Sequence, residues 1–311
     1  MILLCGIPTE SPLALVRDRL DGMRTPYVML SQRRFAEIPF HFEVSGDSVT
    51  GSFTLDGRRY LLENILGVYT RIMDYQSLPE LSGEPSGSKR RLLARDWHDA
   101  VSRWYEIAPI RVVNRAGPMG SNSSKPFQAQ AITRRGFFTP ETLITSDPAL
   151  ALEFVNEHQR VIYKSISGVR SIVQEVDAAD LRRLELIRSC PVQFQAYVDG
   201  RNVRVHTVGD AVFATGITTT ATDYRYAHKT AGQSADLEEV HLSDDLAAQC
   251  VALARDLELP FAGIDLKVTP DERVYCLEVN PSPAYSYYES HTGQPISAAL
   301  ARYLSAGQSV G

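Results

Sequence analysis

Residues 262–281 (AGIDLKVTPDERVYCLEVNP) constrain the fold more tightly than any other part of this sequence. Apolar and polar residues alternate through residues 263–268 and again through residues 274–280, which is typical of half-buried strands. Between these runs, Thr-Pro-Asp-Glu favours a turn. The segment therefore predicts a hairpin of two short strands.

Three oxygen-bearing side chains lie on this hairpin: Asp265, Glu278 and Asn280. If Val268 pairs with Arg273, Asp265 and Glu278 lie diagonal to each other on one face, with side chains that start about 7 Å apart. One or two Mg²⁺ ions can bridge such a gap, and Asn280 adds a neutral carbonyl oxygen. The hairpin therefore predicts a divalent-metal site, with an ordinary hairpin that carries its charges into water as the alternative.

The composition is that of a globular chain with an acidic balance. Its 311 residues are enough for about two domains of ordinary size, and the hydrophobic content of 44% allows a sizeable core. A net charge of −5 without a run of Lys and Arg argues against nucleic acid as a partner. No stretch is long and apolar enough to span a membrane, and no basic segment precedes the short apolar start, so we expect a cytoplasmic protein.

The cysteines are scattered and lack the spacing of a metal site. No Cys-x-x-Cys pair occurs, and no histidine lies at a spacing that would complete a ligand set. We therefore expect reduced cysteines in the core: Cys5, Cys190, Cys250 and Cys276.

The sequence pattern divides into a first domain, residues 1–112, and a second unit that begins near Asn114. The first is predicted to contain a strand–helix–strand opening at residues 1–30, an antiparallel insertion at 46–62, a strand at 65–69 and a helix at 89–105. The second is predicted to contain strands at 143–145, 161–164 and 171–176 and a helix at 148–156. From residue 192 onward, strands are predicted at 192–198, 203–208 and 211–217, followed by a helix that Ser243 caps and by the metal hairpin.

Two lysines in the second domain suit a triphosphate. Lys125 lies in a predicted loop, and Lys164 ends an apolar strand beside a Ser/Gly loop, where backbone N–H groups of Ser167 and Gly168 can cover phosphate oxygens. The string around Lys125 is not a P-loop, because proline follows the lysine where Ser or Thr is needed. Two solvated surface lysines would give the same sequence, and this alternative stays open.

More cations lie on the following strand and loop. Arg204 and His206 share the face of their strand that we expect to turn toward the metal hairpin. A buried arginine needs an anionic partner, which is either a substrate phosphate or a neighbouring carboxylate in a structural ion pair. Arg225 and Lys229 lie in a tyrosine-containing loop that either lines a substrate pocket or is solvated.

With these segments in order, the sequence resembles the ATP-grasp superfamily, in the branch of the ribosomal-protein glutamate ligases and the graspetide synthetases that form peptide macrocycles. The resemblance covers about residues 114–304 and is carried by NRAGPMGSNSSKPFQAQAITRRGFFTPETLIT, VIYKSISG, PVQFQAYVDGRNVRVHTVG, TDYRYAHK, AGIDLKV with LEVNPSP, and ESHTGQPI. It implies an ATP-grasp fold of mixed α/β and α+β type. The parts would be an open α/β pre-ATP-grasp domain at residues 1–112, a small central lid domain at residues 113–194, and a carboxy-terminal α+β domain with the metal site at residues 195–311, with ATP between the last two.

The resemblance also assigns roles to residues. Lys125 and Lys164 would bind phosphates, and Arg204 would hold the γ-phosphate and the developing acyl phosphate, so Lys164 and Arg204 would be the catalytic residues. Asp265, Glu278 and Asn280 would hold two Mg²⁺ ions, which Mn²⁺ can replace.

The adenine of ATP would meet the segment that begins at Gln195, through the carbonyl of Ala196 and the N–H of Val198, with Asn202 near the ribose. This sequence departs from the family pattern here, because Gln195-Ala196 stands where relatives often carry an acidic residue and Asn202 where an Asp is common.

By the same resemblance, the protein would be an ATP-dependent ligase. It would transfer the γ-phosphoryl group to a carboxylate, and an amine or hydroxyl would attack the acyl phosphate, with release of ADP and phosphate. A peptide substrate is the sharper version, and a free amino acid or small amine is the alternative. A phosphotransferase and a catalytically silent ATP-binding regulator belong to other classes.

Substrate contacts are expected from Arg71 and Tyr285, with Arg225 and Lys229. No general base is evident, although His206 and His228 are candidates beside a structural or solvated role. Relatives often pair, so a homodimer is an open alternative.

Overall fold

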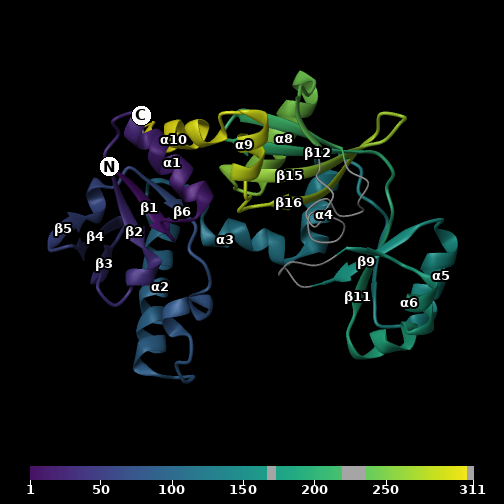
Figure 1. Ribbon diagram of the computed structural model, residues 1–311, viewed down its shortest axis with the longest axis horizontal. Coiled ribbons are helices and arrows are strands. Elements are labelled where there is room, and N and C mark those ends of the chain that lie inside the picture. Colours follow the sequence, from purple (N-terminus) through teal and green to yellow (C-terminus); the bar gives the residue numbers. More distant parts are fainter. Residues whose placement is uncertain (167–172, 219–235, 307–311) are drawn as a thin grey trace.

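The computed structural model describes residues 1–166, 173–218 and 236–306, which form four β-sheets with helices packed against them (Figure 1). Ser167 and Gly168 of the predicted phosphate loop, and the predicted substrate residues Arg225 and Lys229, lie outside the described residues. Among the residues that are described, no helix has the length and apolar character needed to cross a membrane.

The chain opens with a parallel sheet in the order β2-β1-β6-β7, which confirms the strand–helix–strand prediction. A three-stranded antiparallel sheet, β3-β4-β5, lies beside it, and its first strand was missed by the sequence analysis. The elements of this part are β1 Ile2–Gly6, α1 Ser11–Gly22, β2 Tyr27–Ser31, β3 Phe40–Ser45, β4 Ser48–Leu55, β5 Arg58–Leu61, β6 Gly67–Thr70, α2 Lys89–Ile107 and β7 Arg111–Val113.

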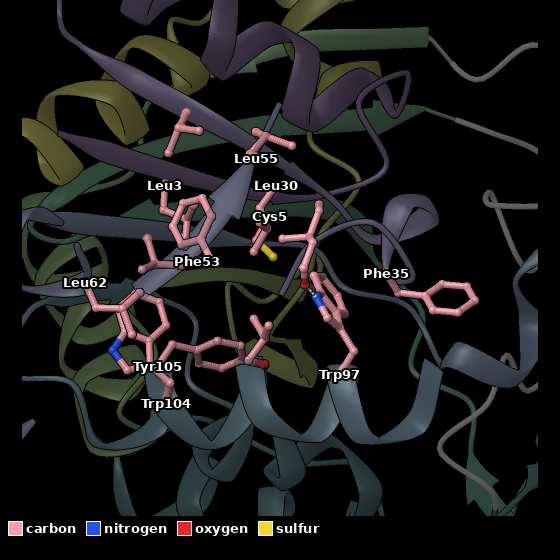
Figure 2. Close-up of a cluster of buried hydrophobic side chains, with 14 of the residues drawn as sticks. Leu3, Cys5, Leu30, Phe35, Phe53, Leu55, Leu62, Trp97, Trp104 and Tyr105 are labelled. Carbon is pink, nitrogen blue, oxygen red and sulfur yellow. Dashed lines mark hydrogen bonds between the residues drawn. The ribbon is translucent and has the colours of Figure 1, made fainter. Parts of the chain in front are cut away.

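Helix α2 closes one face of the parallel sheet with two tryptophans (Figure 2). Trp97, Val101 and Trp104 follow one another at helical spacing, and all three are buried. The Trp97 indole N–H donates to the carbonyl of Ile38 at 3.0 Å, so its polar atom is satisfied inside the core. The ring of Trp104 meets Phe40 of β3 edge-on, with 5.8 Å between the ring centroids. The helix therefore joins both sheets of this part into one core.

The other face of the parallel sheet is covered by α1 and by the last helix of the described chain, α10 (Ile296–Ser305). Leu300 and Leu304 of α10 are fully buried in one cluster with Ile2 and Leu4 of β1. Gly67 permits this approach, because a Cβ there would lie 2.8 Å from the Leu304 carbonyl oxygen. The beginning and the end of the described chain therefore share a core, although the predicted boundaries assign them to different domains.

The central part is a small antiparallel sheet in the order β10-β9-β11-β8, with α5 and α6 beside it (Figure 1). Its elements are β8 Thr142–Thr145, α5 Pro148–Glu157, β9 Val161–Ser165, β10 Gln174–Glu175, α6 Ala178–Arg182 and β11 Val192–Ala196. Ala151, Val161, Ile187 and Phe194 form its small core. Of the strand predicted at 171–176, the structure shows only β10 within the described residues. Cys190 is exposed, so the prediction of a core cysteine is wrong there, whereas the other three cysteines are buried as predicted.

The third part is a five-stranded antiparallel sheet in the order β14-β13-β12-β15-β16. Ser243 caps α8 by accepting a hydrogen bond from the backbone N–H of Leu246, as predicted, and α8 packs with α4 on one face of the sheet. The elements that complete the described chain are α3 Ala116–Met119, α4 Lys125–Arg134, β12 Arg201–Val208, β13 Ala211–Thr218, β14 Asp236–Val240, α8 Asp244–Asp256, β15 Phe261–Val268, β16 Val274–Asn280 and α9 Ser286–Thr292.

Replacing Trp104 with alanine tests the joint core. Because Trp104 is 1% exposed and contacts both sheets, we expect Trp104→Ala to lower the free energy of unfolding by about 3–5 kcal/mol. Urea unfolding followed by circular dichroism measures this loss. Leu93→Ala on the same helix is the matched control, because Leu93 is 46% exposed and its removal should change stability by less than about 0.5 kcal/mol. Equal losses for the two variants would contradict the packing described here.

Candidate active site

The metal hairpin is formed by β15 and β16, but its predicted register is wrong. Val268 pairs with Val274 rather than with Arg273, and a register shift follows Asp265, so that Asp265 lies directly opposite Glu278. The extra residue is Leu277 of β16, which makes this a β-bulge. Directly paired side chains start about 5 Å apart rather than at the longer diagonal distance. The two carboxylates are therefore closer than the sequence predicted.

Arg204 of β12 lies on the other side of Asp265. The two residues are paired across the strands, and the guanidinium Nη1 donates to the Asp265 carboxylate at 2.6 Å. Arg204 is 4% exposed, so the Asp265 carboxylate compensates a buried positive charge. Gly263 leaves room for the guanidinium, since a Cβ at that position would lie 2.1 Å from Arg204 Nη2. A larger residue at this position would therefore displace the guanidinium from Asp265.

Lys125 reaches the hairpin from helix α4, which corrects the prediction that it lies in a loop. Ser124 caps this helix by accepting a hydrogen bond from the N–H of Phe127, and Lys125 is its first residue. The Lys125 ammonium donates to Glu278 Oε2 at 2.9 Å and to the side-chain oxygen of Asn122 at 3.2 Å. The helix start thus holds a cation against the second carboxylate of the hairpin.

The donor set at the hairpin fits a hard divalent cation. Asp265 and Glu278 present carboxylate oxygens, and Asn280, two residues further along β16, presents an amide oxygen that accepts a hydrogen bond from Ser282 N at 2.9 Å. The described part of the chain contains no cluster of three or more His, Cys, Asp and Glu residues suited to a metal. Two carboxylates with a neutral oxygen are the kind of site that Mg²⁺ occupies together with phosphate oxygens and water.

A cleft runs from the hairpin to the central sheet and contains the predicted nucleotide residues that the structure describes. Its lining includes Lys164, Gln195, Ala196, Val198, Asn202, Asp265, Leu266, Lys267, Leu277 and Glu278. An adjoining pocket is lined by Lys125 and again by Lys164 and Gln195. Lys164 is 7% exposed, and its ammonium lies 3.5 Å from Gln195 Oε1. The cleft therefore brings Lys164 and Lys267 together with both carboxylates of the hairpin, and the adjoining pocket adds Lys125.

Lys267 is a cleft residue that the sequence analysis did not select. Its ammonium donates to the carbonyl of Val198 at 2.8 Å and lies 4.5 Å from the centroid of the Tyr197 ring. It is only 8% exposed. The cation thus fixes the segment after β11, where the adenine was predicted to bind. The alternation along β15, which places Lys267 on the same face as Asp265, was the available signal.

Two buried amides hold the hairpin from outside and were also missed. The Gln128 side chain of α4 donates to the carbonyl of Val279 at 2.6 Å and accepts from the N–H of the same residue at 3.2 Å. Asn114 donates to the carbonyls of Phe261 and Pro281 at 2.6 and 2.5 Å, and accepts from Phe261 N at 3.1 Å. Val279 lies between Glu278 and Asn280, so Gln128 fixes the strand between two expected metal ligands.

Two other predicted site residues are buried. Tyr285 is fully buried, and its hydroxyl donates to the carbonyl of Pro12 at 2.6 Å, so the prediction that it contacts substrate is wrong. The nearby Tyr287 and Tyr288 belong to helix α9. His206 is fully buried, with its ring centroid 4.9 Å from that of Tyr288. Burial, and then the charge of Arg204, lower its pKa well below the usual value, which favours a neutral structural residue over a general base.

The remaining residues fall elsewhere. Arg71 follows β6 and lines a separate cavity with Glu10 and Ser282, outside the nucleotide cleft. The other candidate base, His228, lies outside the described residues.

Residues 123–304 match the family model for the RimK-like ATP-grasp domain. Curated relatives include a probable alpha-L-glutamate ligase of Pseudomonas paraeruginosa, 25% identical over 215 residues, which are 66% of this chain and 70% of the relative. Another, from Rhodopirellula baltica, is 26% identical over 220 residues, 67% of this chain and 53% of the relative. This chain belongs to the RimK-like ATP-grasp family, and it is an ATP-grasp ligase.

Solved structures extend the likeness to nearly the whole chain. The ATP-grasp ligase PsnB, complexed with a minimal precursor variant, Mg and ADP, is 27% identical with a TM-score of 0.80, and 97% of each chain is covered. The macrocyclase MdnC of Microcystis aeruginosa MRC, bound with its precursor peptide MdnA, is 20% identical with a TM-score of 0.81, covering 98% and 99% of the two chains. The ATP-grasp fold predicted from the sequence is confirmed.

Gln128→Met removes both hydrogen bonds to Val279 at nearly constant volume. We expect the Mg²⁺ concentration for half-maximal nucleotide binding to rise about tenfold, since partners that orient metal ligands have effects of this size, and stability to fall by about 1–3 kcal/mol. Calorimetric titration with ADP at stepped Mg²⁺ concentrations measures the first effect and thermal melting the second. Gln249→Met is the control, because Gln249 bonds the carbonyl of Arg135, away from the hairpin. A loss of stability at unchanged Mg²⁺ dependence would contradict the positioning role.

Proposed function

We propose that this protein activates a carboxylate of a peptide with ATP and joins it to an amine or hydroxyl of that peptide. The observation that carries the proposal is the direct opposition of Asp265 and Glu278, with Arg204 and Lys125 bonded to them and Lys164 in the same cleft. Cations and metal ligands without a nucleophile suit phosphoryl transfer, in which the protein positions and neutralises.

The two ion pairs at the hairpin explain how the site accepts the charge of a nucleotide. Arg204 compensates the charge of Asp265, and Lys125 compensates that of Glu278, so each carboxylate of the hairpin has a cationic partner. Asp265 and Glu278 would hold a divalent cation, which would supply charge neutralisation for the phosphates. The side chains of Arg204 and Lys125 can then turn from the carboxylates to phosphoryl oxygens, and Lys164 adds a third positive charge. Asn280 completes the proposed metal set of Asp265 and Glu278.

The proposed reaction has two steps. A carboxylate oxygen of the substrate attacks the γ-phosphorus, the bond to the bridging oxygen of ADP breaks, and an acyl phosphate forms. Arg204 and Lys164 stabilise the negative charge on the transferring oxygens. The amine or hydroxyl then attacks the acyl carbon, phosphate leaves with the electron pair of the broken C–O bond, and a proton leaves the nucleophile.

Nucleotide placement follows the same cleft. We propose that the adenine binds the backbone of Ala196 and Val198 beside Gln195, with the ribose near Asn202. Lys267 supports this segment through the Val198 carbonyl. For Ser167 and Gly168, a phosphate role rests on the sequence alone, as does a substrate role for Arg225 and Lys229.

A peptide is preferred as substrate because the likeness to PsnB, which is solved with a precursor, extends over 97% of this chain at 27% identity. The probable glutamate ligases match 66% of it. Their names favour a second candidate, a ligase that adds a free amino acid. A silent ATP-binding regulator is disfavoured, since it would not need all three metal-ligand positions filled. A cytoplasmic location and a homodimer stay predictions from the sequence.

Hydroxylamine trapping tests the activation step. With Mg-ATP and a panel of glutamate, aspartate and acidic peptides, we expect ADP release and a hydroxamate on the accepted carboxylate. Glu278→Gln should lower the rate of hydroxamate formation at least about 100-fold, because it removes a proposed metal-ligand carboxylate and so weakens charge neutralisation at the transferring phosphoryl group. Phosphate assays and mass spectrometry measure both products.

Asp271→Asn is the matched control for this test. Asp271 lies in the turn of the same hairpin and bonds Thr269 and Arg273, so its change should leave the rate within about twofold. A phosphorylated product that never yields hydroxamate would favour a phosphotransferase. Tight Mg-ATP binding without turnover on any carboxylate would favour the regulator.

A further inference from the structure

A second cavity opens at the carboxyl ends of strands β1 and β6 of the parallel sheet. Glu10 follows β1, Arg71 follows β6, and Ser282 comes from the loop after β16. Met73 and Met119 give it an apolar wall. In open sheets with parallel strands, ligands bind outside the carboxyl ends of the strands, so this position is typical of a binding site.

Arg71 orients Glu10 in a definite way. Its Nε and Nη2 both donate to the same carboxylate oxygen, Oε1, at 2.8 and 2.5 Å. Oε2 accepts no hydrogen bond from any residue in the described part of the chain. The Glu10 side chain is 34% exposed and that of Arg71 10%. The arginine therefore fixes the orientation of the carboxylate, while one of its oxygens can accept from a ligand.

A hydrogen-bond chain connects this cavity to the metal hairpin. Arg71 Nη1 donates to Ser282 Oγ at 3.1 Å and to the Pro283 carbonyl at 3.4 Å. The backbone N–H of Ser282 in turn donates to Asn280 Oδ1 at 2.9 Å. The cavity thus adjoins the proposed metal site through an expected ligand, which is where a nucleophile for the activated carboxylate has to arrive.

We propose that this cavity is the acceptor site and that it takes a primary alkyl amine, such as a lysine side chain, in preference to a hydroxyl. The inference rests on the proposed function. Glu10 Oε2 binds the ammonium in a charge-assisted hydrogen bond, Met73 and Met119 contact its aliphatic stem, and Arg71 is a positioning residue. This role differs from the substrate contact predicted for Arg71 from the sequence.

The chemistry gives the carboxylate a task. An alkyl amine arrives protonated at neutral pH, since a lysine pKa is about 10.4. Loss of a proton through Glu10 to solvent frees the nitrogen lone pair. The C–N bond then forms, the acyl C–O bond breaks, phosphate departs with that electron pair, and a second proton leaves the amide nitrogen. A hydroxyl carries no charge for Glu10 to bind.

Binding of two small probes, n-butylamine and n-butanol, tests the site without knowledge of the carboxylate substrate. With the full chain and Mg-ADP, saturation-transfer NMR should show n-butylamine bound at least tenfold more tightly than n-butanol. Glu10→Gln should weaken amine binding at least tenfold, and Glu10→Asp should restore part of it. Glu37→Gln is the control, because Glu37 is 62% exposed and pairs with Arg34 on the surface. Equal binding of the two probes, no binding of the amine, or no effect of Glu10→Gln would overturn the proposal.

Turnover separates this inference from the proposed function. Hydroxylamine is neutral at pH 7 and does not need Glu10, so Glu10→Gln should keep hydroxamate formation within about twofold while amide formation on lysine-containing acidic peptides falls at least tenfold. An ester on threonine-containing peptides, with no amide, would overturn the inference and leave carboxylate activation intact. Absence of hydroxamate from the wild-type chain would instead contradict the proposed function, and the probe-binding result would still decide on the cavity.

Discussion

Two carboxylates held directly opposite each other require neutralisation, and this requirement organises the elements around the metal hairpin. The bulge at Leu277 brings Asp265 and Glu278 together, and each then meets a cation from a different element. Arg204 comes from the neighbouring strand and Lys125 from the start of α4, so the charge balance depends on the correct placement of both. Gly263 and Gln128 follow from the same arrangement, since one leaves space for the guanidinium and the other fixes the strand between the ligands.

The hairpin in turn depends on the amino-terminal sheet. Helix α10 buries its apolar residues against β1, and Asn114, just after β7, bonds backbone groups at the start of β15 and beyond the end of β16. The loop after β16 then meets Arg71 at the end of β6. Residues from opposite ends of the described chain are therefore packed and hydrogen-bonded around the hairpin, and the cavity at the first sheet lies beside the third sheet.

Local pattern predicted much of this architecture, because alternation and helical spacing are short-range properties. The hairpin, the opening of the chain, the helix with its two tryptophans and the Ser243 cap were all predicted. The bulge at Leu277 changes the pairing of β15 with β16 but hardly changes the alternation of apolar and polar residues, so the register of the hairpin was predicted wrongly. Lys125 was assigned to a loop, although Ser124 before Lys-Pro is a signal for a helix start. Gln128 and Asn114 gave no signal, since their partners lie about 150 residues away. Tyr285 shows the opposite error. It was predicted to contact substrate because it lies in a polar segment, but it is buried and bonded to Pro12 of α1, which is far away in the sequence.

An acidic chain can still present a cationic cleft, because net charge and local field are different properties. The chain carries −5 overall, yet four cations, Arg204, Lys125, Lys164 and Lys267, lie at the cleft and its adjoining pocket with the two carboxylates of the hairpin, a local balance of +2. A triphosphate needs cations within a few ångströms, where burial strengthens each interaction, whereas charges beyond about 10 Å are screened by salt. The same reasoning separates the two sites: the cleft gathers positive charge for phosphate, and the second cavity keeps one carboxylate oxygen for a cation.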